Sequence, residues 1–482
     1  MGKSIIKNYL YNNILLIFNL IYPFFTMVYV NKIFSLETIG EISFALSIIT
    51  VFISLSSLGI PVYGMREIAI NRHDLKKMSK IFSELLTLNF ISTIIFGIIY
   101  FIIIYFYIEN SKNLQIYLIL SINLLLNSFL LEWFYTGLEE YEYITKRNIL
   151  VKIISFIFMI FFIKTEKDVN LYLIFLVLGT SLNGFFNIYN SKKYVKFSFI
   201  KVKLKDKIHG LKYFYFQVII GIFYNGCDQI ILGLQSTSTQ VAYYARCRQL
   251  IVVPIVISSS FTKTLIPRIN NIVNNEYEYR KLVKLSFNFA FLLSFPTLVG
   301  ILFLSKNTLY IIGGDKFLPA ENVLKVASLL LIVSFLAVFL DTNISVPHRK
   351  EKNTLYGNIV VMLSSIILAL IFVRKYGALG SVFSLVIGEG LGAITQLFFI
   401  KKEKIYFKFF DKNIFKYILA SIVMGIELFL IKFLHFSYIA EFLICLIAGG
   451  ITYFLILFLL KEDIIILGVN MLKNRFIKEK LK

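Results

Sequence analysis

Apolar stretches of about 20 residues recur from one end of this chain of 482 residues to the other. Each is long enough to cross a bilayer core of roughly 30 Å as a helix. Hydrophobic residues make up 58% of the chain and the mean hydropathy is +0.77, far more apolar than a soluble protein of this length. We therefore predict an all-α integral membrane protein.

About fourteen transmembrane helices are expected. They are placed at residues 14–30, 41–63, 84–108, 114–135, 149–164, 169–189, 213–234, 241–267, 285–305, 320–346, 353–373, 378–400, 413–434 and 438–460. The first stretch has no small-residue cleavage site after it, so we interpret it as a retained span. An even number of spans places both termini on the same side of the membrane.

The distribution of basic residues predicts which side that is. Loops that follow even-numbered spans, together with both termini, hold about four times as many Lys and Arg residues as the alternate loops. The richest loops are 66–80, 192–212 and 401–416. Basic loops stay in the cytoplasm, so we expect both termini there. This placement also accounts for the net charge of +22 without a nucleic-acid partner.

One long basic connection divides the chain. Residues 191–212 form a cytoplasmic linker between six spans before it and six after it. We predict an N-terminal lobe at 1–190, a C-terminal lobe at 213–400, and two further helices with a basic cytoplasmic tail at 401–482. Six spans on each side of the linker suggest two similar lobes.

No pattern in the sequence predicts an enzyme. The chain has no GxxxxGK[ST] phosphate loop, and its four His residues form no metal-binding cluster. The three cysteines, Cys227, Cys247 and Cys445, lie in apolar segments without disulfide or zinc spacing. We expect no catalytic residue, no metal and no cofactor.

Several segments resemble the polysaccharide repeat-unit flippases, the Wzx-type transporters of the multidrug/oligosaccharidyl-lipid/polysaccharide exporter superfamily. These segments are residues 35–69, 132–148, 242–250, 265–269 and 313–328. Within the second segment, the resemblance lies in a Trp-x-x-x-Gly-x-Glu pattern at Trp133, Gly137 and Glu139.

The resemblance implies two six-helix lobes around a central cavity that opens alternately to the two sides of a bacterial inner membrane. It implies a polyprenyl-diphosphate-linked oligosaccharide as cargo, moved to the outer leaflet for O-antigen or capsule synthesis. A polysaccharide polymerase and chain-length machinery would be partners. The alternative in the same fold is an ion-coupled multidrug exporter, but its cavity should be acidic, whereas the charges inside 241–267 are basic.

Two predicted helices carry polar residues at matching depth. The spans 213–234 and 241–267 are antiparallel neighbours, so Asp228 lies at the level of Arg246, and Asn225 at that of Gln249. Such a pair either pins the two helices together or lines a cavity.

A cavity function would use the basic residues of these helices. A diphosphate needs cationic donors, and Arg246, Arg248 and Lys263 could supply them. Asp228 would hold Arg246 until cargo arrives. Gln217 extends the polar stripe of Asn225 and Asp228 along the same helix.

A second carboxyl lies deep in a predicted span. Glu389 is close to the middle of 378–400, between Gly388 and Gly392, whose spacing permits close helix packing. Glu389 is either a hydrogen-bonded packing residue or a proton site that couples transport. Lys152 and Glu132 are interpreted as residues near helix ends.

Overall fold

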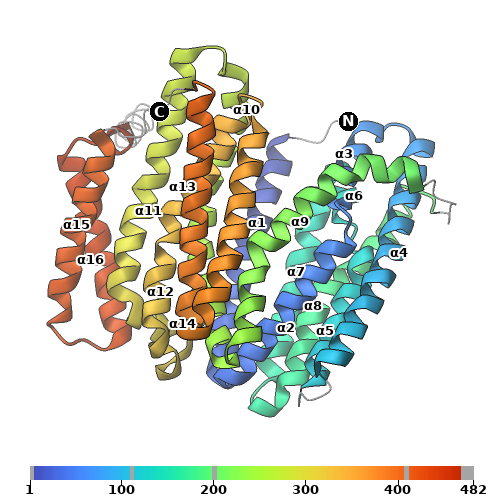
Figure 1. Cartoon of the computed structure of the whole chain (residues 1–482), viewed down its shortest axis with the longest axis horizontal. Helices are drawn as coiled ribbons and strands as arrows, with labels where there is room; N and C mark the ends of the chain where they lie inside the picture. Colours follow the sequence, from blue (N-terminus) through green and yellow to red (C-terminus); the bar gives the residue numbers. More distant parts are fainter. Residues whose placement is uncertain (1–4, 109–112, 198–203, 406–411, 468–482) are drawn as a thin grey trace, which may run out of the picture. The chain divides into compact units, whose positions relative to one another are not determined.

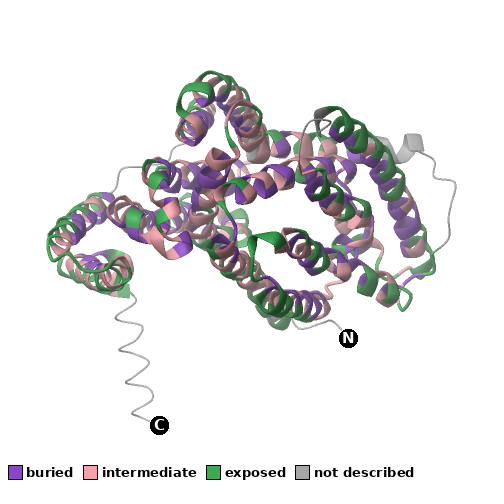
Figure 2. Ribbon diagram, turned by 90° about the horizontal axis from the view of Figure 1, so that it is seen from below, coloured by how far each residue is buried: buried purple, intermediate pink, exposed green. Residues whose placement is uncertain are grey.

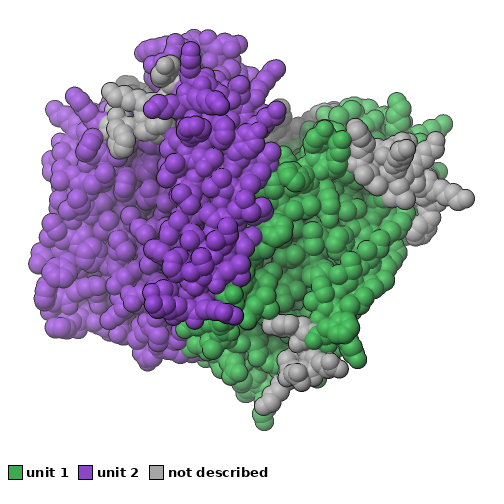
Figure 3. Space-filling model, in the orientation of Figure 1, with its two compact units in different colours: residues 1–242 green, residues 243–482 purple. Residues whose placement is uncertain are grey.

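The computed structural model is built of helices, and the residues it describes contain no strand (Figure 1). The described ranges are 5–108, 113–197, 204–405 and 412–467. The chain divides into two compact units, residues 1–242 and 243–482 (Figure 3). In Figure 2, the helices are buried along one side and exposed along another, as expected of helices that pack together and also face lipid.

The first unit contains the helices up to the end of α9. They are α1 (Ile5–Ile33), α2 (Leu36–Ser56), α3 (Ile60–Asn71), α4 (Leu75–Ile108), α5 (Leu114–Leu126), the short 3-10 helix η1 (Asn127–Phe129), α6 (Glu132–Gly137), α7 (Tyr141–Phe162), η2 (Glu166–Asp168), α8 (Val169–Ser191) and α9 (Leu204–Gln235). The helix α10 (Ser238–Ile272) begins just before the boundary between the units.

The second unit continues α10 and adds the remaining helices. They are α11 (Glu276–Gly313), η3 (Asp315–Ala320), α12 (Glu321–Ser328), α13 (Leu330–Phe339), the π-helix η4 (Leu340–Ser345), α14 (Glu351–Lys402), α15 (Lys412–Lys432) and α16 (Tyr438–Leu459). The Tyr453 hydroxyl of α16 donates to the Leu292 carbonyl of α11 at 2.8 Å, which fixes α16 against the core of the unit.

The predicted multi-span membrane architecture is confirmed, whereas the number fourteen stays a prediction. Eleven helices of the described residues are long and apolar enough to cross a membrane. The number is twelve if α9 is one span, bent by 43° between its arms 210–223 and 226–235. α7 is not among these helices, and it carries three basic residues, Lys146, Arg147 and Lys152.

α14 is one element of 52 residues that holds two antiparallel arms. As a single straight helix it would be about 78 Å long, more than twice the thickness of a bilayer core. The chain breaks at Gly377, whose φ of 55° and ψ of −130° suit glycine. Beyond the break the second arm returns along the first, because a Cβ added at Gly357 would lie only 3.0 Å from the Gly392 carbonyl oxygen. This is the pair of spans predicted for the stretch.

The Trp-x-x-x-Gly-x-Glu pattern joins α6 to α3. A Cβ at Gly64 of α3 would lie 2.6 Å from Cε3 of the Trp133 ring, so only glycine leaves room for the indole. A Cβ added at Gly137 would likewise lie 2.9 Å from Cβ of Ile68, and Glu139 pairs with Arg72 at 2.7 Å. All the named positions of the pattern therefore hold two helices together.

Two spans expected to be continuous are broken in the structure. The stretch predicted as 114–135 ends its helix α5 at Leu126, and the chain turns through Leu131 with a φ of 49° before α6 begins. The stretch predicted as 41–63 divides into α2 and α3 at Gly59, with a φ of 75°. Each break is followed directly by a short helix, α3 after Gly59 and α6 after Leu131. These two short helices contact each other, so both breaks lie beside the α3–α6 contact.

Candidate functional site

α7 carries positive charge near its middle. Its 22 residues give a length of about 33 Å, which matches a bilayer core. Lys152 lies about 17 Å from the Tyr141 end, near the midpoint of the helix. The expectation that Lys152 lies near a helix end was wrong, because α7 begins eight residues before the predicted span. The charged residues of its first turns had lowered the hydropathy there.

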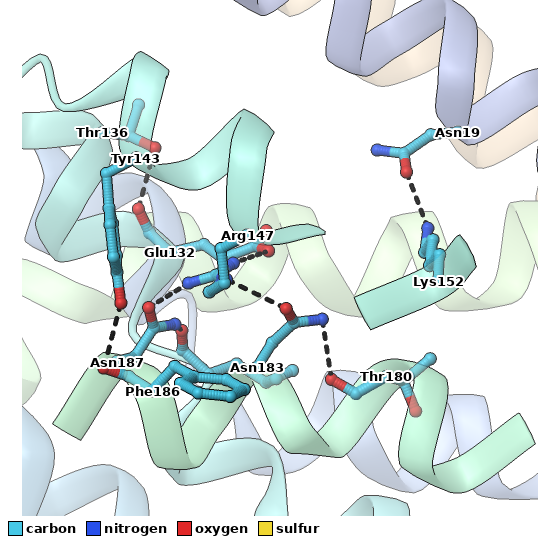
Figure 4. A network of polar contacts seen from close by, with 11 residues as sticks. Asn19, Glu132, Thr136, Tyr143, Arg147, Lys152, Thr180, Asn183, Phe186 and Asn187 are labelled. Atoms are coloured by element: carbon cyan, nitrogen blue, oxygen red, sulfur yellow. Dashed lines mark hydrogen bonds and ion pairs between the residues drawn. The ribbon is translucent and has the colours of Figure 1, made fainter. Parts of the chain in front are cut away.

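Arg147 is buried and uses its whole guanidinium group (Figure 4). Its Nε donates to Oδ1 of Asn183 at 2.9 Å, and a terminal nitrogen donates to Oδ1 of Asn187. The other terminal nitrogen lies 3.3 Å from Oε1 of Glu132. Asn183 and Asn187 are four residues apart on one face of α8, so a single guanidinium spans both.

Aromatic residues complete the surroundings of Arg147. The Tyr143 ring, one turn earlier on α7, lies 5.5 Å from the guanidinium carbon. The Tyr135 hydroxyl of α6 donates to the Asn187 carbonyl at 2.5 Å, and the Tyr143 hydroxyl donates to the Phe186 carbonyl at 2.9 Å. Arg147 therefore connects α6, α7 and α8, with its donors occupied by neighbours in the same unit.

Lys152 has a different environment. Its ammonium donates to Oδ1 of Asn19 on α1 at 2.6 Å and lies 5.3 Å from the Tyr22 ring centroid. Both partners are neutral, and no carboxylate of the described residues forms an ion pair with Lys152. The Glu132 carboxylate attracts Lys152 electrostatically without pairing with it. A cation placed inside a helix bundle in this way marks a pathway or a ligand site. Lys152 is therefore the residue of this unit best suited to meet an anion.

The predicted residues of α9 lie in the same unit. Asp228 is buried, 6% exposed, and its Oδ1 accepts from the Gln229 amide at 2.8 Å. The Gln229 side chain donates to the Ser43 carbonyl at 2.7 Å, which joins α9 to α2. Gln217 is exposed. The side chain of Asn225 lies outside the described residues.

The predicted basic residues lie on α10 in the second unit. Arg246 donates to Oε1 of Gln249 at 3.3 Å, and Arg248 donates to the buried Tyr244 hydroxyl at 3.0 Å. The two arginines thus have different partners. Lys263 is exposed and lies about 22 Å farther along the helix. α10 therefore does not bring the three cations together in one compact cluster.

The pairing of Asp228 with Arg246 joins residues of different units, and it stays a prediction.

Glu389 lies deep in the second arm of α14. It is 3% exposed and accepts a hydrogen bond from the Ser334 hydroxyl of α13. The close packing expected at the neighbouring glycines is present. A Cβ at Gly388 would lie 3.0 Å from Cβ of Ser365. Among the described residues, no group of three or more His, Cys, Asp and Glu side chains could hold a metal.

The sequence-based selection missed Arg147 and Lys152 as site residues. Arg147 is the penultimate residue of the family-like segment 132–148, and the hydropathy pattern predicts a loop there, between the spans 114–135 and 149–164. A helical reading of that segment would have put Tyr143 and Arg147 on one face, four residues apart.

The chain is similar to known proteins both in sequence and in structure. The family described as "Polysaccharide biosynthesis protein" matches residues 5–273. A Shigella dysenteriae protein assigned as an O-antigen transporter is 23% identical, over 81% of this chain and 99% of its own length.

Two solved structures share the fold. The lipid II flippase MurJ, in an inward closed conformation, superposes with a TM-score of 0.77 at 17% identity, over 95% of this chain and 100% of its own. An inward-facing multidrug resistance MATE family transporter gives a TM-score of 0.55 at 15% identity, over 79% of this chain and 93% of its own.

Proposed function

The chain belongs to the polysaccharide biosynthesis protein family, and on this premise we propose that it is a flippase for a lipid-linked oligosaccharide. The cargo is one repeat unit on a polyprenyl diphosphate, moved from the cytoplasmic to the outer leaflet for a surface polysaccharide such as O-antigen or capsule. The relatives that support this are transport proteins and not enzymes. Alternating access of the two units to the two sides provides the path.

The observation that carries the proposal is the half-buried cation at the middle of α7, whose direct hydrogen-bond and ring partners are neutral. A diphosphate is the most strongly charged part of such a cargo and needs donors at membrane depth. Lys152 offers an ammonium whose described partners, Asn19 and Tyr22, are neutral. A diphosphate would supply a directly paired countercharge, and Lys is a common point-charge ligand for phosphate.

The predicted residues of α9 and α10 take further roles in this proposal. Arg246, Arg248 and Lys263 contact the diphosphate at successive depths along α10, and Asp228 holds Arg246 before cargo arrives. The polar residues that line the cavity in this proposal are Gln217, Asn225 and Gln249.

Glu389 is proposed as the residue that couples transport to an ion gradient. A carboxyl in a desolvated helix interface can exchange a proton when the conformation changes. Its hydrogen bond from Ser334 joins α13 to α14, so a change of protonation would alter the packing of these two helices.

The chain is a multi-pass membrane protein, and we place it in the bacterial cytoplasmic membrane. Both termini and the linker 191–212 lie in the cytoplasm, with lobes at 1–190 and 213–400 and the added helices at 401–482. A thiol introduced at Ser198 tests this topology. It should react only with permeant reagents, and labelling of intact cells by an impermeant reagent would contradict the orientation.

A multidrug exporter of the same fold is the alternative. Exporters of cationic drugs need acidic groups in the path. The charged residues of α10 are basic, and those of α7 beyond its first-turn Glu142 are basic as well, which favours an anionic cargo. A strain that lacks efflux pumps separates the two functions, since the alternative predicts drug resistance and the flippase predicts none.

The central experiment uses a strain that lacks its own flippase. Lys152→Gln keeps a donor for Asn19 but removes the charge, and it should lower surface polysaccharide by about tenfold at equal protein level. Lys152→Arg should retain part of the export, because it keeps the charge. The matched control is Lys167→Gln, at an exposed lysine near the end of α7. Full export by Lys152→Gln would contradict the role of this cation.

A further inference from the structure

A pocket of about 260 Å³ lies in the first unit, apart from the Arg147 and Lys152 sites. It is formed by the early turns of α4, by η1 and by the end of α8 with the segment that follows. Two aromatic pairs line it, Phe82 with Phe197 at 6.5 Å between ring centroids and Phe90 with Phe129 at 6.0 Å. The pocket thus has aromatic walls from elements far apart in the sequence.

The interior of the pocket is apolar in its chemistry. Its two hydroxyl groups already donate to the backbone, Thr87 to the Ser83 carbonyl at 2.7 Å and Ser191 to the Ile188 carbonyl at 2.8 Å. Neither donor is left for a polar ligand, such as a sugar. A hydrocarbon chain is the ligand part that suits such walls.

The edge of the pocket is basic. Lys192 lines it, is exposed and forms no ion pair with the described residues. Lys193 and Lys196 follow within one turn, and the Lys196 amide donates to the Ser79 hydroxyl of α4 at 3.2 Å. This bond brings the segment beside Lys80, which is also exposed. Lys192 therefore supplies the cation at the edge of the pocket, and three further lysines lie near it along the two segments that this bond joins.

The pocket is continuous with the surface that α4 offers to lipid. Phe90 is a wall residue and is 37% exposed. Ile94 and Ile98 follow it at four-residue spacing on the same face and are 45% and 56% exposed. An apolar exposed face of a membrane-spanning helix contacts acyl chains. A ligand thus enters from the bilayer and not from water.

We propose that this pocket binds an anionic phospholipid, with one acyl chain between the aromatic walls and the phosphate against Lys192. We assign the pocket to a bilayer phospholipid and not to the loaded polyprenyl carrier, because the interior offers no free donor for the sugar that the carrier bears. The bound lipid connects α4 to residues 192–197, at the beginning of the basic linker. This inference rests on the membrane location and not on the identity of the cargo.

The test uses the full-length protein, purified in detergent and freed of bound lipid. Binding of phosphatidylglycerol is measured by native mass spectrometry beside phosphatidylcholine with the same chains. The anionic lipid should bind more tightly, and Lys192→Gln should weaken it by about fivefold, the worth of one lysine near an anionic headgroup. Lys167→Gln, an exposed lysine outside the pocket, should bind as the unmodified protein does.

A second measurement locates the chain without a substitution. Phosphatidylglycerol that carries a photoreactive group in one acyl chain should cross-link to the peptide that contains Leu86 and Phe90. Equal binding of the two lipids, or cross-links only elsewhere, would overturn the proposal. Displacement of phosphatidylglycerol by polyprenyl phosphate at equal concentration would assign the pocket to the carrier and would also overturn it.

Discussion

Replacement of Arg147 by Met tests whether this arginine is a structural centre or a cargo ligand. The change removes the guanidinium N–H groups that donate to the side-chain oxygens of Asn183 and Asn187, and it keeps an unbranched side chain. Each buried amide oxygen left without a donor costs about 1–3 kcal/mol, and the lost contact with the Tyr143 ring costs about 0.5–1 kcal/mol. Relief of the desolvation of the guanidinium offsets part of this sum. We expect a loss of about 3 kcal/mol in the free energy of unfolding.

Thermal unfolding of the purified protein measures the effect. In a unit of 242 residues, a loss of 3 kcal/mol corresponds to a decrease in Tm of about 6–12 °C. Lys146→Met is the matched control, since Lys146 is the preceding residue on α7 and 66% exposed, and it should leave the Tm nearly unchanged. If Arg147→Met melts like the unmodified protein but fails to export polysaccharide, the structural explanation is refuted and Arg147 joins the cargo site.

Three further changes test other parts of the structure. Gly64→Ala places a methyl group against the Trp133 ring and should destabilise the protein by about 1–3 kcal/mol, seen as a lower Tm, whereas an unchanged Tm would contradict the α3–α6 contact. Glu389→Gln should be produced normally but lose the pH dependence of transport, and an unchanged pH profile would make it a packing residue. Replacing Asp228 by Asn together with Arg246 by Gln should restore protein abundance relative to either single change, but not export; full export would leave only a structural pair.

Most of the helices could be predicted from hydropathy alone, because a bilayer core requires long apolar runs. The breaks could not. Residues such as Leu131 are as apolar as their neighbours, and the positive φ at that position depends on how α6 packs on α3. A local pattern does not contain this tertiary contact.

The site residues were harder to predict for a related reason. Charged residues lower the hydropathy of a segment, so the hydropathy pattern predicts α7 without its first eight residues, which include Lys146 and Arg147. Lys152 then looked like a residue near an interface. Only the length of α7 in the structure shows that this ammonium lies at the midpoint, and only the contact with Asn19 shows that its described hydrogen-bond partner is neutral.

The α3–α6 contact affects how sequences of this kind should be grouped. The pattern of Trp133, Gly137 and Glu139 is the most recognisable signature in the chain, and each of these residues touches α3 or the residue that follows it. A database search based on this signature therefore collects proteins by how one lobe is assembled. Sorting them by sugar would require positions that face the cargo, and the signature contains none of the cargo residues proposed here.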